Sequence, residues 1–336
     1  PLYYGSEGVL VEQHIVSRDK AEGVVKVYLS TKELDHTTLT VRFVGEDGYE
    51  VVSRTVKVSK ISPDRAIEVP FEIVQPQLWS PDKRTMYRVE ITLGDVKHPL
   101  DELVLYTGLR SVMISEDNKL CINGVAVDVK GVSLPHDRAG FGTAITRQHI
   151  DEDFAMLRDM GANAVRSIIG PHDGHLYDLC DKEGVLAWVD VPFSRYEYAF
   201  SDICYYPTVA LRDNGFEQLK EVVAQNYNHP SVVMWGIFSL VWQRGDDLLG
   251  YVGELNDLAH SLDVSRPTVC CSNSDGAINF ITDLAVLRQN VGWIKGSIED
   301  VDIWCEQLSS NKSWASLRCG VAYGEAGVQG HNCERV

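Results

Sequence analysis

The sequence lacks the long apolar runs of membrane proteins and the basic surface of nucleic-acid-binding proteins. None of its hydrophobic stretches approaches the ~18 residues that a membrane-spanning helix needs, so we expect no membrane partner. Acidic residues outnumber basic ones by 48 to 31, which gives a formal net charge of −17. Because an acidic surface repels phosphate backbones, we expect no nucleic-acid partner either.

Several motifs of common chemistry are also missing. The chain contains no Gly-rich phosphate loop, no Walker motif and no Ser-centred nucleophile elbow, so nucleotide and acyl-transfer chemistries have no support. The 8 cysteines form no C-x-x-C pair, and Cys121, Cys270, Cys271 and Cys319 lie in apolar, strand-like runs. This distribution favours buried free thiols over a disulfide framework and leaves the cellular compartment open.

What is present is an ordinary globular composition. The chain is 44% hydrophobic and 24% charged, which excludes disorder, collagen and coiled coil. At about 150 residues per domain, 336 residues predict about two domains, with one large barrel as the main alternative. The sequence opens on Pro1–Tyr4 without an initiator Met or a leader, so we expect it to be the interior of a longer protein.

The first part of the chain, residues 1–107, has the pattern of an all-β domain. Runs of β-branched and aromatic residues, partly alternating, are separated by turn signals such as Glu46-Asp47-Gly48. The clearest runs are Val9–Val11, Val24–Leu29, Leu39–Val44 and Tyr87–Thr92. Short strands at this spacing over about 100 residues predict an immunoglobulin-like β-sandwich.

The second part, residues 108–336, has the pattern of a parallel α/β fold. An Asn-Gly hairpin signal at Asn123-Gly124 is followed by apolar strands that alternate with amphipathic helices, the clearest from Arg147 to Met160 and from Asp213 to Tyr227. The strands are expected at Ala126–Val132, Asn163–Ser167, Leu186–Val191, Val232–Phe238, Thr268–Ser272, Phe280–Val286 and Cys319–Ala322. This alternation predicts a TIM-type (β/α) barrel that lacks its last strand.

Motifs along nearly the whole chain resemble glycoside hydrolase family 2, the β-galactosidase and β-glucuronidase family. They include Leu78–Asp82, Thr107–Arg110, Ile122–Gly124, Lys130–Val132, Gly161–Arg166, Tyr177–Asp181, Asn228–Ser231, Trp235–Phe238, Arg266–Thr268 and Ser272–Gly276. The resemblance implies a retaining glycosidase fold, no cofactor, and a bacterial periplasmic or cytoplasmic location. It also places the family's jelly-roll domain before Pro1 and the last barrel strand after Val336.

Both catalytic positions of the family are replaced. Retaining glycosidases need two carboxyl groups about 5 to 5.5 Å apart, one as acid/base and one as nucleophile. The resemblance implies the acid/base as the Glu of an Asn-Glu pair after strand 4, where this chain has Ser239-Leu240. It implies the nucleophile within a Ser-Glu-Tyr-Gly stretch after strand 7, which places Tyr323 there, two positions before Glu325. Leucine cannot donate a proton, and tyrosine is rarely a nucleophile on sugars.

Other departures gather at the same rim of the barrel. The family's polar residues after strands 1, 2 and 6 are replaced by Leu134-Pro135, Ile169–Pro171 and Leu287–Val291, and only Asp190 keeps the acidic type. Asp190 is therefore a candidate base, a sugar-hydroxyl acceptor or an ion-pair partner of Arg166, the last favoured because matched charges on adjacent strands satisfy each other. The candidate substrate-binding residues are Arg166, His136, Asp137, His172, Trp235, Ser239, Asn273, Arg288 and Tyr323.

Two further clusters carry alternative interpretations. His136, His172 and His175 lie near Asp137 and Asp173, but their spacing fits no zinc signature, and hydrogen bonding within rim loops is favoured over a metal site. An aromatic-rich loop after strand 3 is expected either to line a binding site or to pack over the barrel mouth. Its aromatic residues are Tyr196, Tyr198, Phe200, Tyr205 and Tyr206.

The sequence thus predicts a non-hydrolytic, carbohydrate-binding relative of the family, a pseudoenzyme, with a carbohydrate or other small molecule at the barrel mouth. One alternative is an active β-glycosidase that uses Glu325 and Asp190 as its catalytic carboxylates. Another is a barrel whose pocket is rebuilt for a different ligand or reaction. An open barrel leaves unpaired strand edges, so pairing with another copy into an oligomer is a further expectation.

Overall fold

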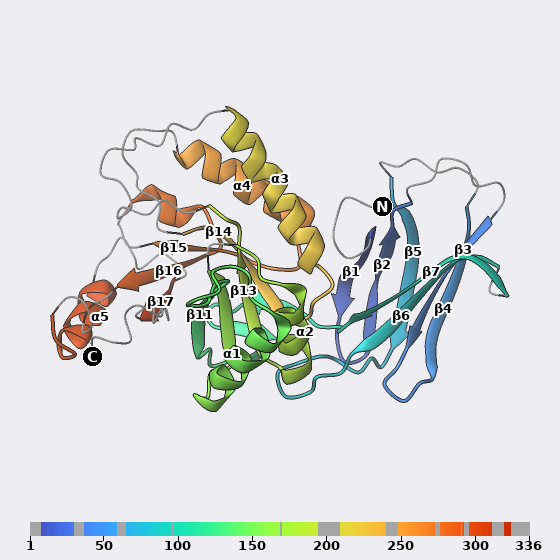
Figure 1. Ribbon diagram of the computed structural model, residues 1–336, viewed down its shortest axis with the longest axis horizontal. Coiled ribbons are helices and arrows are strands. Elements are labelled where there is room, and N and C mark those ends of the chain that lie inside the picture. The colour runs from blue at the N-terminus through green and yellow to red at the C-terminus, as the bar shows by residue number, and fades with distance from the viewer. Residues whose placement is uncertain are drawn as a thin grey trace.

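The computed structural model of the protein describes residues 8–29, 37–58, 65–95, 97–168, 170–193, 209–239, 248–272, 276–289, 291, 296–310 and 319–323. They form a β-sandwich and a curled parallel sheet covered by helices, side by side (Figure 1). Within these residues, no helix is long and apolar enough to cross a membrane.

The first body is the immunoglobulin-like sandwich that the strand spacing predicts. One antiparallel sheet joins β1 (Val9–Val16), β2 (Lys20–Val27) and β5 (Ile67–Val74). The other orders its strands as β4 (Glu50–Val58), β3 (Thr37–Val44), β6 (Tyr87–Asp95) and β7 (His98–Thr107). Every second residue of β2 is buried, as expected for a strand with one face on a core. That core joins both sheets through side chains such as Phe43 and Phe71, whose rings lie 4.7 Å apart.

A small antiparallel sheet follows the sandwich. It consists of β8 (Val112–Ile114), β9 (Leu120–Ile122) and β10 (Val125–Ala126). Asn123 and Gly124 both have positive φ, 53° and 76°, the backbone of the Asn-Gly hairpin turn that the sequence predicts. The predicted first barrel strand, Ala126–Val132, was therefore misplaced. Its first residue ends the hairpin, and the barrel strand β11 is Gly131–Pro135.

The second body is a seven-stranded parallel sheet of TIM type in which the strands follow one another in sequence order. After β11 come β12 (Ala164–Ile168), β13 (Leu186–Asp190), β14 (Val232–Ser239), β15 (Thr268–Ser272), β16 (Leu284–Gln289) and β17 (Cys319–Tyr323). The connecting helices are α1 (Arg147–Asp159), α2 (Gly174–Glu183), α3 (Val209–Asn226), α4 (Leu248–Leu262) and α5 (Asp300–Ser310). In the described part of the chain, β11 and β17 are the two ends of this sheet.

The sixth barrel strand also begins later than its apolar pattern predicts. Residues Ala277–Phe280 form a 3-10 helix, and the strand starts at Leu284. An apolar side chain at Phe280 fits either structure, because a short apolar run carries no period that separates a strand from a helical turn.

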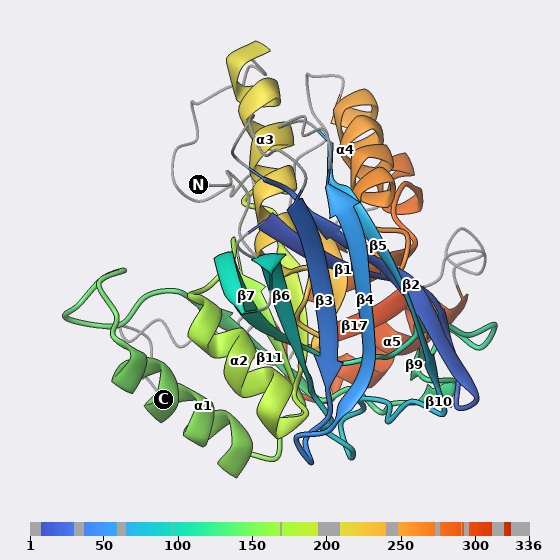
Figure 2. The same cartoon turned by 90° about the vertical axis from the view of Figure 1, so that its right-hand side faces the viewer.

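The sandwich docks against the amino-terminal ends of the barrel strands. Asn228, just before β14, accepts a hydrogen bond from Val11 N at 2.9 Å and donates one to Val9 O at 2.8 Å. The Arg110 guanidinium, 2% exposed, donates to the carbonyl oxygens of Pro230 and Val232. Seen from the sandwich side, in Figure 2, the sandwich strands lie across the barrel. This docking leaves the carboxyl ends of the strands, where TIM-barrel sites form, away from the sandwich.

Candidate functional site

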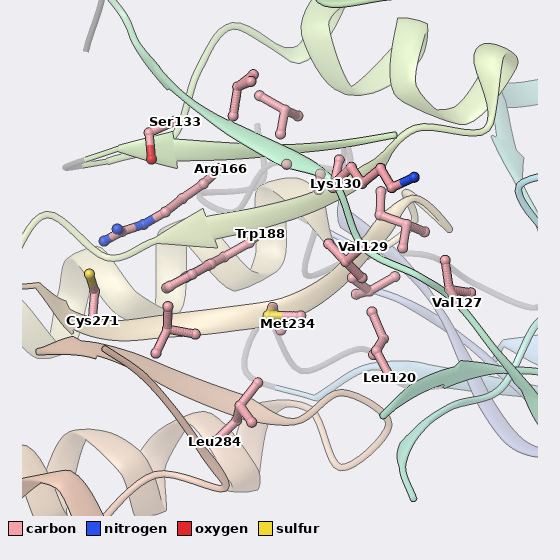
Figure 3. A pocket seen from close by; sticks show the side chains of 18 of the residues that line it. Leu120, Val127, Val129, Lys130, Ser133, Arg166, Trp188, Met234, Cys271 and Leu284 are labelled. Atoms are coloured by element: carbon pink, nitrogen blue, oxygen red, sulfur yellow. The ribbon is translucent and has the colours of Figure 1, made fainter. Parts of the chain in front are cut away.

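The interior of the curled sheet holds a cavity of about 680 Å³. Its wall is formed by β11 to β16 together with the hairpin β8–β9 and residues of the segment between β10 and β11. Figure 3 shows a gradient along this wall, with Leu120 and Val127 near the amino ends of the strands and Arg166, Trp188 and Cys271 toward their carboxyl ends. The floor of the cavity is mostly apolar, with Asn118, Lys119 and Lys130 as polar lining residues, and Arg166 and Arg288 lie toward the carboxyl ends, where TIM-barrel sites form.

Strand alternation places the two largest polar or aromatic side chains of β12 and β13 on the wall of this cavity. In β13, Leu186 and Trp188 line the cavity, whereas Val189 belongs to the core between the sheet and the helices. In β12, Arg166 lines the cavity, two residues after the inward-packed Ala164. The period of two along a strand thus presents a guanidinium and an indole on one wall.

Arg166 and Asp190 form a buried ion pair at the carboxyl ends of β12 and β13. Arg166 Nε and Nη2 lie 3.1 and 2.7 Å from Asp190 Oδ2, and Nη2 also donates to Ser239 Oγ at 2.9 Å. The guanidinium carbon sits 4.2 Å from the centroid of the Trp188 ring. Both charged residues are almost fully buried, at 6% and 1% exposure. The ion pair preferred from the sequence is confirmed.

Gly236 makes room for this arrangement. A Cβ built on Gly236 would overlap Asp190 Oδ1 and Trp188 Nε1. Any side chain on this glycine of β14 would push the carboxylate or the indole away from Arg166. Gly236, Trp188 and Cys271 were not predicted as site residues, although the apolar strands that carry them were predicted.

The two histidines of the rim come together without the third. His136 Nδ1 lies 3.3 Å from His172 Nδ1, and His172 Nε2 lies 2.7 Å from Leu134 O. His175 instead contacts Asp151 of α1 through its Nε2, at 2.7 Å. The favoured interpretation, hydrogen bonding within rim loops, therefore holds for His136 and His172. Asp137 next to them is exposed.

The remaining predicted residues lie in different places. Arg288 is buried and lines the cavity. Trp235 is fully buried outside it, in the core under the helices, where its Nε1 donates to Asp263 Oδ2 at 2.9 Å. Tyr323 ends β17, whose backbone pairs with β16. Leu240, Asn273 and Glu325 lie outside the described residues, as does the aromatic loop.

Asp178, Asp181 and His229 are the one group in the described ranges with three potential metal ligands close together. His229 Nδ1 already donates to Asp181 Oδ2 at 2.6 Å, and Asp181 Oδ1 accepts from Ser231 N. Two ligands of a tetrahedral zinc ion lie roughly 3.4 Å apart, given bonds of about 2.1 Å. The shorter contact marks a hydrogen-bonded pair that fixes α2 to the start of β14 rather than a cation site.

Family models match both bodies of the chain. The model for glycosyl hydrolases family 2 matches residues 7–110, and the model for the TIM barrel domain of the same family matches residues 112–312. A β-glucuronidase of Bacteroides fragilis is 34% identical over 332 residues, which cover 98% of this chain and 47% of that protein. The chain therefore spans about half the length of this relative.

Two solved structures are similar over most of the chain. The FMN-binding β-glucuronidase from Facaelibacterium prausnitzii L2-6 has a TM-score of 0.82 and 26% identity, covering 95% of this chain and 48% of that one. Bacteroides uniformis β-glucuronidase 2, covalently bound to cyclophellitol-6-carboxylate aziridine, has a TM-score of 0.76 and 26% identity, covering 91% and 38%.

Proposed function

Since the chain belongs to glycosyl hydrolases family 2, we propose that it binds a carbohydrate at the carboxyl-end rim of its barrel and does not hydrolyse glycosides. We place the domain boundary of this proposal after residue 107, with the sandwich before it and the barrel-type domain at 108–336. The observation that carries the proposal is that the rim has no carboxylate at the two catalytic positions of the family. Leucine and tyrosine stand at Leu240 and Tyr323, and Asp190 is tied to Arg166.

Without a general acid and a nucleophile, the barrel lacks the two groups that lower the barrier to hydrolysis. Glycoside hydrolysis needs a barrier reduction on the order of 20 kcal/mol. The loss of a general acid alone forfeits roughly 10²- to 10⁴-fold in rate, and a retaining enzyme without its nucleophile has no covalent intermediate to hydrolyse. A scaffold that has lost both can still bind its ligand, because binding uses different side chains.

Binding is supported by the side chains at the carboxyl ends of the barrel strands. Arg166, Ser239 and Arg288 supply polar groups on the alternate strands β12, β14 and β16, and Trp188 supplies an aromatic ring next to Arg166. Carbohydrates are recognised by this combination of hydrogen bonds and stacked rings. We assign Asp190 to the same surface, as the group that holds Arg166 in place.

A second candidate function is an active β-glycosidase in which Glu325 and Asp190 act together. The names of the relatives favour it, since they are β-glucuronidases and β-galactosidases. A third candidate is a pocket rebuilt for an apolar ligand, which the apolar floor around Leu120, Met234 and Leu284 favours.

Turnover measurements separate the first two candidates. We expect the purified chain to release no nitrophenol from nitrophenyl β-galactoside or β-glucuronide. Turnover that disappears in Glu325→Gln and survives in the matched surface variant Glu68→Gln would overturn the non-hydrolytic proposal in favour of the active glycosidase.

Thermal unfolding separates carbohydrate binding from apolar binding. A ligand that binds the native state at 100 times its Kd stabilises it by about 2.7 kcal/mol. We expect galactose or glucuronate to raise the Tm and an uncharged apolar probe such as naphthalene to leave it unchanged. The reverse result would support the rebuilt pocket. Arg288→Gln should abolish the sugar effect, whereas Arg18→Gln, an exposed residue of the sandwich, should preserve it.

A further inference from the structure

The loop after β12 is fixed to the end of β11 by the ring of His172. The backbone N–H of His172 donates to Tyr177 Oη at 2.9 Å, and Tyr177 Oη lies 2.8 Å from Ser167 Oγ. The two ring nitrogens of His172 contact Leu134 O and His136 Nδ1. His172 is 9% exposed. The two hydrogen bonds of the ring, the one of the backbone N–H and burial therefore leave this ring one position.

These contacts determine where the ring protons are. A carbonyl oxygen only accepts, so the contact with Leu134 O requires the proton of His172 on Nε2. Burial, the largest influence, lowers the pKa of His172 to about 4 despite the hydrogen bond to Leu134. The ring is therefore neutral at neutral pH, and its Nδ1 is bare.

The bare nitrogen of His172 in turn fixes the tautomer of His136. Because His172 Nδ1 can only accept, the 3.3 Å contact between the two rings requires a proton on His136 Nδ1. The rings meet edge to face, with centroids 4.9 Å apart and planes at 85°. In neutral His136 the other nitrogen, Nε2, then carries a lone pair and no hydrogen.

We propose that His136 is a carbohydrate-binding residue whose Nε2 accepts a hydrogen bond from a ligand hydroxyl, and that His172 is the positioning residue that holds it in the Nδ1–H tautomer. His136 follows β11 at the same rim as Arg166 and is only partly buried, so a ligand can reach it. An acceptor at this place selects O–H groups and disfavours carboxylates, which have no proton to give.

The inference rests on the proposed carbohydrate binding, but its first test does not need a ligand. Long-range ¹H–¹⁵N correlation spectra of the ¹⁵N-labelled protein distinguish the two tautomers of each histidine. We expect His136 as Nδ1–H and His172 as Nε2–H. An unconstrained histidine favours Nε2–H, so finding His136 in that form would overturn the inference.

A variant pair identifies His172 as the cause. In His172→Phe, we expect His136 to move to the Nε2–H tautomer, since the acceptor for its Nδ1–H is gone. In the matched control His175→Phe, which removes a ring bonded to Asp151 and not to His136 or His172, His136 should keep Nδ1–H. An unchanged tautomer in folded His172→Phe would remove His172 from its positioning role.

Ligand binding provides the second test. We expect His136→Phe to weaken galactose binding roughly three- to tenfold, the usual effect of one neutral hydrogen bond. One member of a deoxygalactose series should bind the wild type weaker by a similar factor and bind His136→Phe no worse than galactose does.

The outcomes of the two tests distinguish the inference from the proposed function. Sugar binding by the wild type that is unaffected in His136→Phe contradicts the inference alone. No binding of any sugar by the wild type contradicts the proposed function and the ligand role of His136, while the tautomer measurement still decides whether His172 positions His136.

Discussion

The two ends of the barrel strands differ in how their polar groups are used. At the amino ends, where the sandwich docks, Asn228 and Arg110 satisfy backbone groups across the junction. At the carboxyl ends, Arg166 and Arg288 line a cavity, and Arg166 is held there by Asp190. The lesson is that one end is constrained by packing, so its residue types are required for folding. The side chains at the other end face a cavity, so we expect changes there to disturb the fold less.

Arg266 is the centre of the junction end. It donates to Asp263 Oδ2 at 2.6 Å and to the carbonyl oxygens of Tyr227, His229 and Val232. Both charged groups are almost fully buried. The neighbouring Arg110 shows how tightly charge is confined here, because burial, followed by repulsion from Arg266, lowers its pKa to about 9.

The largest effect should follow from breaking this centre. Arg266→Met leaves the Asp263 carboxylate buried without its cation, and removal of one partner of a buried pair costs about 3 to 5 kcal/mol. We expect the free energy of unfolding, measured in urea, to fall by this amount. Arg18→Met, on an exposed position of the sandwich, should stay within about 0.5 kcal/mol. Equal effects of the two variants would show that the junction is not the constrained end.

A smaller effect is expected at the cavity end. Gly236→Ala places a methyl group against Asp190 and Trp188, and overpacking of this kind typically costs about 1 to 3 kcal/mol. Gly253→Ala in α4 is the matched control, because a Cβ there meets nothing, and it should stabilise by about 0.4 to 1 kcal/mol. Urea unfolding measures both. If Gly236→Ala is as stable as Gly253→Ala, the ion pair at the rim is looser than its buried geometry indicates.

The smallest effect is a pH dependence at the junction. Burial lowers the pKa of His229, but attraction to Asp181 and the hydrogen bond to it, with Asp178 adding, outweigh burial and raise the pKa above 6.5. A raised pKa in the folded state stabilises the protein fully below pH 6.5, and this contribution is lost as the pH rises through the folded-state value.

The measurement is the Tm between pH 6 and 9 for the wild type and His229→Gln. The wild type should lose stability relative to the variant as the pH rises, so that the two curves converge. His98→Gln, at an exposed position of β7, is the matched control variant. Parallel curves for the wild type and His229→Gln would contradict the raised pKa.

Local pattern was enough for most of the secondary structure. The strands of the sandwich and the Asn123-Gly124 turn follow from alternation and backbone preference, which act over a few residues. The errors at Ala126 and Phe280 arose where an apolar run continues across a boundary, so that its period does not change. Which face of a barrel strand points inward was less predictable. In a strand buried on both faces, such as β14, Met234 and Trp235 are equally apolar, yet only Met234 lines the cavity.

The sequence by itself determined the β-sandwich followed by a parallel α/β sheet, and the family, because these depend on periodicity and on motifs of adjacent residues. The tertiary structure alone decided that the ring of His172 reaches both Leu134 and His136 and that Gly236 leaves space for Asp190. Hydrogen bonds and steric contacts act over a few ångströms, and folding brings to that distance residues that lie 36 to 46 positions apart in the chain.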